Sequence, residues 1–376
     1  MSASAIPLPG PRWYGFNLLE YFSIDIDWMR YFPYKNDGLF PEDDFRWMAE
    51  WGFNFCRLPM DYRFWTDPQD MMTIREQALE PIDRAIGLGH KYDIHVCLNL
   101  HHAPGFCIVD SNADNPLVHV TTESTSYYDN AATRDAFVHQ WALFADRYRG
   151  IPGEQLSFNL VNEPLPAASN WSELWAAIES EKLSVEELAG PYIDLAQTAI
   201  DAIRARDSER WIISDGFLVG RAPLPQLAGP RVMQSCRGYT PSAITHYRCE
   251  WASMEPDPQY ADPPTWPLAT APGEVAYDRA ALGALYRPWA EAAEEGIPIH
   301  CGECGCYKNT PHSAMLGWFE DLMGALGDIH CGWALWNLRG PFGVLDTMRN
   351  DVDYADWHGH ALDRQLLEML QGAIIL

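Results

Sequence analysis

The feature that most constrains the fold is an alternation of short apolar runs with longer helical patterns, repeated roughly eight times along the chain. Short and nearly continuous apolar runs are typical of parallel strands that are covered on both faces, and the helical segments between them supply the crossovers. We expect strands at residues 13–17, 53–58, 94–100, 156–161, 211–215, 232–236, 297–303 and 331–336. The pattern predicts an α/β fold of the (β/α)₈ barrel type, as a single domain over residues 1–376 with long loops after the strands.

The segments between these runs carry helix signals. The segment 41–51 begins with Pro41, has acids in its first turn and ends before Gly52, as helices commonly do. We expect further helices at 74–90, 131–149, 184–206, 278–295, 311–326 and 359–371. The alternative is a doubly wound sheet, which usually has a glycine-rich G-x-G-x-x-G turn after its first strand, and the first turn here has none.

Charge and cysteine content narrow the class of protein. The formal net charge of −26 argues against nucleic acid and anionic membranes as partners, because both require a basic face. Nine cysteines, most of them inside expected strands, suggest buried free thiols in a reducing compartment. The N-terminus lacks the pattern of a signal peptide, and no stretch reaches the roughly 18 apolar residues of a membrane helix. We therefore expect a cytoplasmic protein, or a secreted one if a signal segment preceded this sequence.

Polar and aromatic side chains recur where the expected strands end. They are Asn17, Arg57, His101, Asn162, Glu163, Asp215, Tyr239, Glu303 and Trp336. The carboxyl ends of barrel strands meet at one face, and barrel enzymes keep their chemistry there. Packing alone explains such a set poorly, so the sequence predicts an active site at this face.

Two glutamates stand out in that set. Glu163 follows the run 156–161, and Glu303 ends the run 297–303. Two carboxyl groups about 5–5.5 Å apart are what retaining glycoside hydrolysis needs, one as proton donor and then base, the other as nucleophile. Either glutamate taken alone also fits a capping or salt-bridged acid.

The order of several short motifs resembles glycoside hydrolase family 5, the cellulase-type group of retaining barrel enzymes, over essentially the whole chain. The matching residues are Arg57 in Cys-Arg-Leu-Pro, His101 in Asn-Leu-His-His-Ala-Pro-Gly, Asn162-Glu163-Pro164, Tyr239 in Tyr-Thr-Pro, Thr245-His246, Glu303 and Trp336. The resemblance implies that Glu163 is the acid/base and Glu303 the nucleophile. It also implies that no metal or cofactor is needed.

The same resemblance suggests which residues bind the sugar. Asn162 would bond the 2-hydroxyl of the reacting sugar, Arg57 and Tyr239 would hold the nucleophile, and Trp336 would form the floor of the central subsite, unless it is simply core. His101, His102 and His246 complete the expected substrate-binding set. One departure is Arg237, which stands two residues before Tyr239 where the family usually has histidine. Arg237 would bind a more polar or acidic substrate, or point away.

Other interpretations remain open. His101 and His102 resemble a zinc pair, although adjacent strand residues face opposite ways and no third ligand is evident. Cys301 and Cys304 have the C-x-x-C spacing of a redox pair, yet they straddle the end of a strand.

Two other kinds of barrel protein remain as alternatives. A non-catalytic sugar-binding barrel would keep Trp171, Trp175 and Trp336 but tolerate loss of either glutamate. An aldolase would need a lysine at a strand end, and Lys308 lies beyond one. We expect a retaining β-glycoside hydrolase acting on β-linked glucan- or mannan-type oligo- or polysaccharides, or on small β-glycosides.

Overall fold

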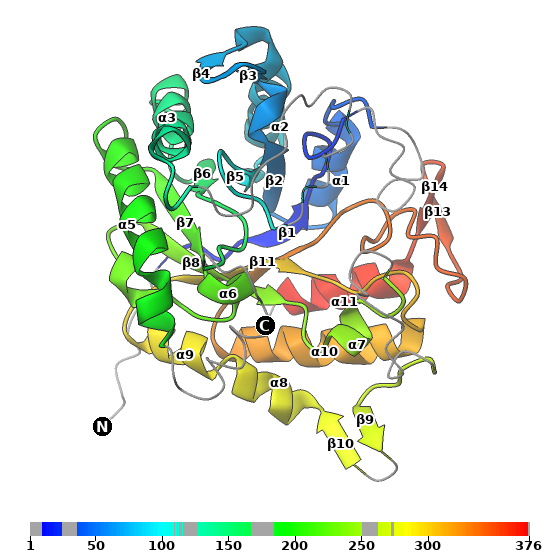
Figure 1. Cartoon of the computed structure of the whole chain (residues 1–376). Coiled ribbons are helices and arrows are strands. Elements are labelled where there is room, and N and C mark those ends of the chain that lie inside the picture. Colours follow the sequence, from blue (N-terminus) through cyan, green and yellow to red (C-terminus); the bar gives the residue numbers. More distant parts are fainter. Residues whose placement is uncertain are drawn as a thin grey trace, which may run out of the picture.

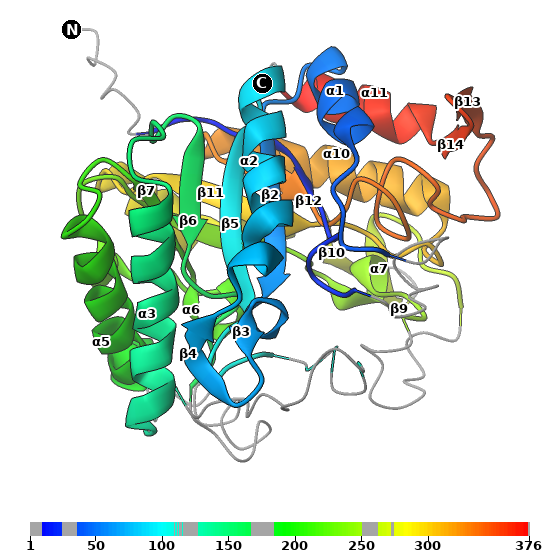
Figure 2. The ribbon, with the colours of Figure 1, turned by 90° about the horizontal axis from the view of Figure 1, so that it is seen from above.

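The structure, a computed structural model, describes residues 10–24, 36–108, 110, 112, 115, 127–166, 184–249, 262–271 and 274–374. Eight parallel strands form a closed barrel in the order β1-β12-β11-β8-β7-β6-β5-β2. Helices surround this ring, and α3 and α5 lie side by side outside it in both views (Figures 1 and 2). The predicted (β/α)₈ barrel is confirmed.

All eight expected strands are present, with small shifts at their ends. They are β1 (Tyr14–Asn17), β2 (Phe55–Asp61), β5 (His95–His102), β6 (Leu156–Asn159), β7 (Trp211–Asp215), β8 (Val232–Gly238), β11 (Ile299–Cys304) and β12 (Gly332–Leu335). The main helices are α1 (Glu42–Glu50), α2 (Glu80–Tyr92), α3 (Ala131–Arg147), α5 (Val185–Arg204), α8 (Arg279–Leu285), α9 (Arg287–Glu294), α10 (His312–Asp328) and α11 (Arg364–Ile374).

Local signals explain where several helices begin. Asn130 caps α3 by accepting from the backbone N–H groups of Ala132 and Thr133. Ser184 and Glu187 form a reciprocal capping box at the start of α5. The helix expected over 278–295 is in fact two helices, α8 and α9, because Pro288 near the start of α9 has no N–H to continue the first helix.

Three two-stranded hairpins on the outside of the barrel were not predicted. They are β3–β4 (Thr66–Asp67 and Asp70–Ile74), β9–β10 (Leu268–Ala271 and Glu274–Tyr277) and β13–β14 (Ala355–Trp357 and His360–Leu362). The connection from β7 to β8 has only the short turns α6 (Phe217–Gly220) and η3 (Pro225–Leu227). A further turn, α7 (Ser242–Thr245), follows β8.

Aromatic packing fills the amino-terminal end of the barrel. Trp13, just before β1, belongs to a buried cluster with Phe55, Ile213 and Met233. Its ring stacks on His95 with 3.9 Å between centroids. The amino-terminal end of the barrel is therefore closed by apolar packing. The polar residues that end the strands lie at the opposite face, where a site can form.

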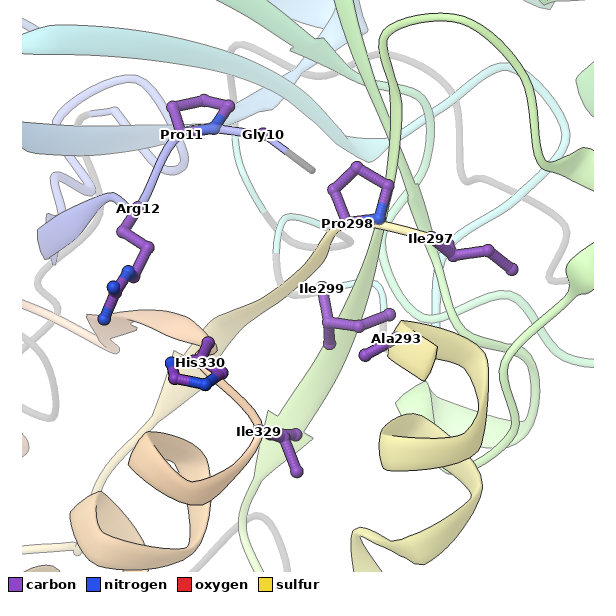
Figure 3. Close-up of a pocket in the computed structure, with 9 residues that line it drawn as sticks. All are labelled: Gly10, Pro11, Arg12, Ala293, Ile297, Pro298, Ile299, Ile329 and His330. Carbon is purple, nitrogen blue, oxygen red and sulfur yellow. The ribbon is translucent and has the colours of Figure 1, made fainter. Parts of the chain in front are cut away.

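A small pocket lies at the same amino-terminal end, and Figure 3 shows the residues that line it. Its lining includes Gly10 and Arg12, which precede β1, and Pro298 and Ile299 at the start of β11. It is therefore at the end of the barrel opposite the carboxyl ends of the strands.

No helix in the described part of the chain is long and apolar enough to cross a membrane.

Candidate active site

Glu303, on β11, is held from two sides at the carboxyl face of the barrel. Its Oε1 lies 2.6 Å from Nη1 of Arg57, and its Oε2 accepts a hydrogen bond of 3.2 Å from the Tyr239 hydroxyl. The side chain is only 4% exposed. A carboxylate with a guanidinium and a phenol at its two oxygens has a fixed orientation and a stabilised negative charge.

Arg57, on β2, is itself fixed by side chains from other strands. Its Nε donates to Oδ1 of Asn159 over 2.8 Å, and Nη1 donates to Oδ1 of Asn17 over 2.9 Å. Nη2 donates to Oδ1 of Asn162, also over 2.9 Å. Asn17 is anchored in turn by its Nδ2, which donates to two backbone carbonyls over 3.0 Å each. Every guanidinium nitrogen of Arg57 therefore has a partner, and these bonds fix the guanidinium beside Glu303.

Glu163 reaches the site from the loop after β6. The expected strand over 156–161 ends earlier, at Asn159, and the chain then places Glu163 in the left-handed region with φ 50°. Its backbone N–H donates to Oδ2 of Asp215 over 3.0 Å, and its side-chain Oε1 accepts from Nε of Arg237 over 2.8 Å. The loop is thus tied to β7 through the backbone and to β8 through the side chain.

The environment of Glu163 favours its protonated form. Burial raises its pKa to about 7, the guanidinium of Arg237 opposes that rise, and the negative charges of Glu303 and Asp215 add to it. A carboxyl group with a pKa near neutrality can hold a proton and give it up, as a general acid must.

Asn162 is oriented by both arginines. Its Oδ1 accepts from Nη2 of Arg57 and from Nη2 of Arg237, each over 2.9 Å. Because both donors take the amide oxygen, the amide nitrogen faces away from them and can donate. This is the polarity that a bond to a sugar hydroxyl requires.

Arg237, on β8, points into the site and bridges its acids. Nη2 donates to Oδ2 of Asp215 and lies 3.4 Å from Oε1 of Glu303, while Nε bonds Glu163. Nη1 donates to Oγ of Ser235 over 3.0 Å. The alternative that Arg237 points away is therefore wrong. Its hydrogen-bonding groups are occupied by the protein's own side chains.

Asp215 belongs to the site, although the sequence predicts no catalytic or substrate-binding role for it. It is fully buried and lies 3.8 Å from Nη2 of Arg57. Burial raises its pKa, but the charges of Arg237 and Arg57 outweigh that effect and hold the pKa below its ordinary value. The available signal was its position at the end of β7, between the strand ends that carry Glu163 and Arg237.

A left-handed turn packs against Arg237. Leu218, Val219 and Gly220 in α6 all have positive φ, of 55°, 62° and 71°. The Leu218 N–H donates to the carbonyl of Pro164 over 3.1 Å. A Cβ at Gly220 would lie 2.6 Å from Cγ of Arg237, so only glycine fits beside that stem. Left-handed residues with side chains are costly and are found where surrounding structure enforces them.

Aromatic rings form another part of the site. Trp336 follows β12, and its ring centroid is 5.4 Å from that of His101, with 36° between the planes. Burial holds the pKa of His101 well below its ordinary value, so the ring is neutral. His246 lies 5.2 Å from Tyr239 between centroids, and burial lowers its pKa to about 4. Both imidazoles are thus uncharged, and Trp336 and His101 are largely buried, each with 7% of its surface exposed.

His102 has different polar partners from the two proposed catalytic glutamates. Its Nδ1 lies 2.6 Å from Oδ2 of Asp61, and the ring is fully buried. Asp61 also pairs with Arg63. The structure thus places His102 in a buried ionic cluster rather than among the contacts of the two glutamates, although it was expected to bind substrate.

His102, Cys107 and Asp110 bring ligand-type atoms within 4.8 Å of one another. However, Arg63 donates to both oxygens of Asp110, over 2.7 and 3.0 Å. A guanidinium already neutralises the only acid of this group, so the group suits an ion-pair network better than a metal ion.

Cys301 and Cys304 lie within the barrel wall. Both are buried free thiols, and their sulfurs contact the backbone carbonyls of Glu303 and Ala334. All nine cysteines are buried. A redox pair that exchanges with other thiols must be accessible to them, and these buried sulfurs are not.

Trp171 and Trp175, which a sugar-binding barrel would keep, lie outside the described residues.

The sequence profile of the family described as Cellulase (glycosyl hydrolase family 5) matches residues 18–339. Endoglucanase C of Acetivibrio thermocellus is 23% identical over 324 residues, covering 81% of this chain and 85% of that protein. Cellodextrinase A of Ruminococcus flavefaciens is 23% identical over 301 residues, covering 78% and 77%. A crystal structure described as that of a glycoside hydrolase is 32% identical, with a TM-score of 0.79 over 96% of this chain and 99% of the other.

Proposed function

Because the chain belongs to glycosyl hydrolase family 5, we propose that it is a retaining β-glycosidase that cleaves β-linked gluco- or manno-oligosaccharides, polysaccharides or small β-glycosides by double displacement. The observation that carries this proposal is the sharing of one guanidinium by two carboxyl groups. Arg237 lies 2.8 Å from Glu163 and 3.4 Å from Glu303. Such an arrangement keeps the two acids near one another, in keeping with the roughly 5–5.5 Å separation of retaining enzymes.

Glu303 is the proposed nucleophile. In the first step its oxygen attacks the anomeric carbon while the bond from that carbon to the leaving oxygen breaks. Arg57 and Tyr239 hold the two oxygens of the carboxylate in place, which lowers the entropy lost on reaching the transition state. Asn162, with its oxygen held by two arginines, donates to the 2-hydroxyl, where a bond strengthens as positive charge develops on the sugar.

Glu163 is the proposed acid and base. It gives its proton to the leaving oxygen in the first step and takes a proton from water in the second, when that water displaces Glu303 from the anomeric carbon. Its pKa of about 7 suits both directions of transfer near neutral pH.

The contacts of Arg237 bear on the choice of substrate. A free arginine in the site would favour an acidic sugar, but Arg237 is engaged by Glu163, Asp215, Asn162 and Ser235. With its charge neutralised inside the protein, a neutral sugar is the better partner. The names of the relatives, an endoglucanase and a cellodextrinase, support β-linked glucose polymers or their short fragments.

The test is turnover of aryl β-glycosides and of β-1,4-linked gluco- and manno-oligosaccharides, with the first-formed product anomer read by ¹H NMR. Retention predicts that the β-anomer appears first and then mutarotates. Initial formation of the α-anomer would contradict the retaining mechanism. Binding of oligosaccharides without turnover of any of them would favour the sugar-binding barrel instead.

A further inference from the structure

An arginine in contact with the proton donor presents a chemical problem. Nε of Arg237 lies 2.8 Å from Oε1 of Glu163, and the arginine is only 7% exposed. A guanidinium at this distance stabilises the carboxylate and so works against the protonated form that a general acid needs. Burial of Glu163 acts against this effect, and a negative charge beside the arginine would add to the preference for the protonated form.

Asp215 has the geometry of such a negative group. Its Oδ2 accepts from Nη2 of Arg237 and from the backbone N–H of Glu163, the second over 3.0 Å. Its Oδ1 accepts from Nδ2 of Asn159 over 2.9 Å. The side chain is fully buried, so it bonds the arginine and the acid's own backbone but is closed off from a substrate.

The charges around Glu163 come from four barrel strands. Among the described residues they are Arg57 on β2, Asp215 on β7, Arg237 on β8 and Glu303 on β11. Tyr239 and His101 also face this group, and burial keeps both uncharged near neutral pH by raising the pKa of the tyrosine and lowering that of the histidine. Two arginines thus meet three acids.

The charge balance of this buried group follows the catalytic cycle. In the free enzyme it is neutral when one of the three acids carries a proton. In the glycosyl-enzyme, Glu303 is esterified and uncharged, Glu163 has given up its proton, and the group is again neutral. Without Asp215 the free site would be neutral with Glu163 ionised, and the glycosyl-enzyme would carry an excess positive charge. Low-dielectric surroundings penalise such an imbalance.

We propose that Asp215 is a positioning residue and internal counter-ion that neutralises Arg237, so that Glu163 holds its proton until it transfers it to the leaving oxygen. This rests on the proposed function. It explains how an arginine stands where the family usually has a histidine. Asp215 touches neither substrate nor reacting atoms, and it acts through Arg237 and through the Glu163 backbone.

The test compares the pH dependence of kcat/KM for the wild type, Asp215→Asn, Arg237→Gln and the double variant, with phenyl β-glycosides as substrates. The alkaline limb of this profile reports loss of the Glu163 proton. Removing the negative charge in Asp215→Asn moves that limb to lower pH, and removing the positive charge in Arg237→Gln moves it to higher pH, each by about one unit or more. The double variant returns towards the wild type. Glu295→Gln, an exposed charge change on the helix side of the barrel, leaves the limb in place.

Two comparisons keep the proposal open to refutation. Asp215→Asn alone could fail to fold, because Arg237 is then left without its partner. In that case the double variant is compared with Arg237→Gln, and the alkaline limb of kcat/KM should lie at lower pH in the double variant. An unchanged limb in that comparison, or shifts of the two single variants in the same direction, would overturn the proposal.

A second measurement separates this inference from the proposed function. The ¹³C signal of the Glu163 carboxyl, identified by its loss in Glu163→Gln, can be titrated in labelled protein without any substrate. The same opposite shifts are expected there. If no glycoside is turned over, the proposed function fails, while this titration still decides the role of Asp215.

Discussion

Arg237 and Glu163 form a buried ion pair in which Nε of the arginine lies 2.8 Å from Oε1 of the glutamate. The same guanidinium lies 3.4 Å from Glu303, so the two proposed catalytic acids share one cation. A histidine at this position would be shorter and would carry charge only below its pKa. The arginine gives the site a permanent charge, and the surrounding acids are arranged to match it.

Glu303→Ala is expected to reduce kcat on aryl β-glycosides by on the order of 10³-fold or more, because a double displacement cannot start without its nucleophile. The melting temperature and circular dichroism spectrum of the variant check that it is folded. Glu295→Gln, which removes an exposed carboxylate, should retain wild-type activity. Near-normal activity in Glu303→Ala would show that another residue is the nucleophile.

Glu163→Ala is expected to lose more activity on substrates whose leaving group needs a proton than on substrates whose leaving group does not. Phenyl β-glycosides need a proton on the departing oxygen and should react roughly 10²–10⁴-fold more slowly. Dinitrophenyl β-glycosides have a leaving group that departs without help, so formation of the glycosyl-enzyme should be much less affected. The measurement is kcat/KM across a series of aryl glycosides of graded leaving-group pKa. A loss of equal size across the series would argue against an acid role.

Trp336→Ala is expected to raise KM for oligosaccharides about 10-fold, corresponding to ~1.4 kcal/mol of lost contact between the ring and the apolar face of a sugar. Trp336→Phe keeps an aromatic face and should recover part of the affinity. Initial rates over a range of cello-oligosaccharide concentrations measure both. Unchanged KM in the alanine variant would mean that Trp336 serves only the core, where it contacts Phe22 and His101.

Glu20→Gln is expected to stabilise the protein at alkaline pH. Burial raises the pKa of Glu20 to about 8, with a further rise from Asp44, and its Oε2 has no hydrogen-bond partner among the described residues. Because the folded-state pKa lies above the unfolded value, the contribution of Glu20 to stability is largest below about pH 4.5 and is lost as pH rises to the folded-state pKa of about 8. Glutamine cannot ionise, so the variant escapes this loss, which is on the order of a few kcal/mol.

Urea unfolding at pH 5 and pH 8.5 measures the effect of Glu20→Gln. The difference between variant and wild type should grow with pH. Glu50→Gln, an exposed carboxylate at the end of α1, is a control that should show no such growth. A pH-independent difference for Glu20→Gln would mean that Glu20 is ionised in the folded protein at both pH values.

Much of the fold was predictable because it depends on local pattern. Each apolar run became a barrel strand, and the polar residues that follow these runs came together at one face, as the geometry of parallel strands requires. Strand ends were less certain. β6 stops at Asn159, before Val161, because the chain must turn to place Glu163 beside Asp215.

The parts that sequence could not supply depend on side chains from distant strands meeting. The role of Asp215 follows from contacts with Arg237 and Arg57, which are on different strands and far away along the chain. Whether the Arg237 side chain points into the site also depends on residues of other strands, Glu163 and Asp215, and so could not be predicted. Nor do local preferences predict Val219 in a left-handed conformation, since β-branched residues rarely adopt it.

The close fit between Gly220 and Arg237 links two positions that sequence alone treats as independent. A side chain at 220 would collide with the arginine stem. Where a descendant of this enzyme carries a smaller residue at 237, the constraint on 220 is relaxed, and where the arginine is kept, glycine should be kept with it. Across related sequences the two positions are therefore expected to change together.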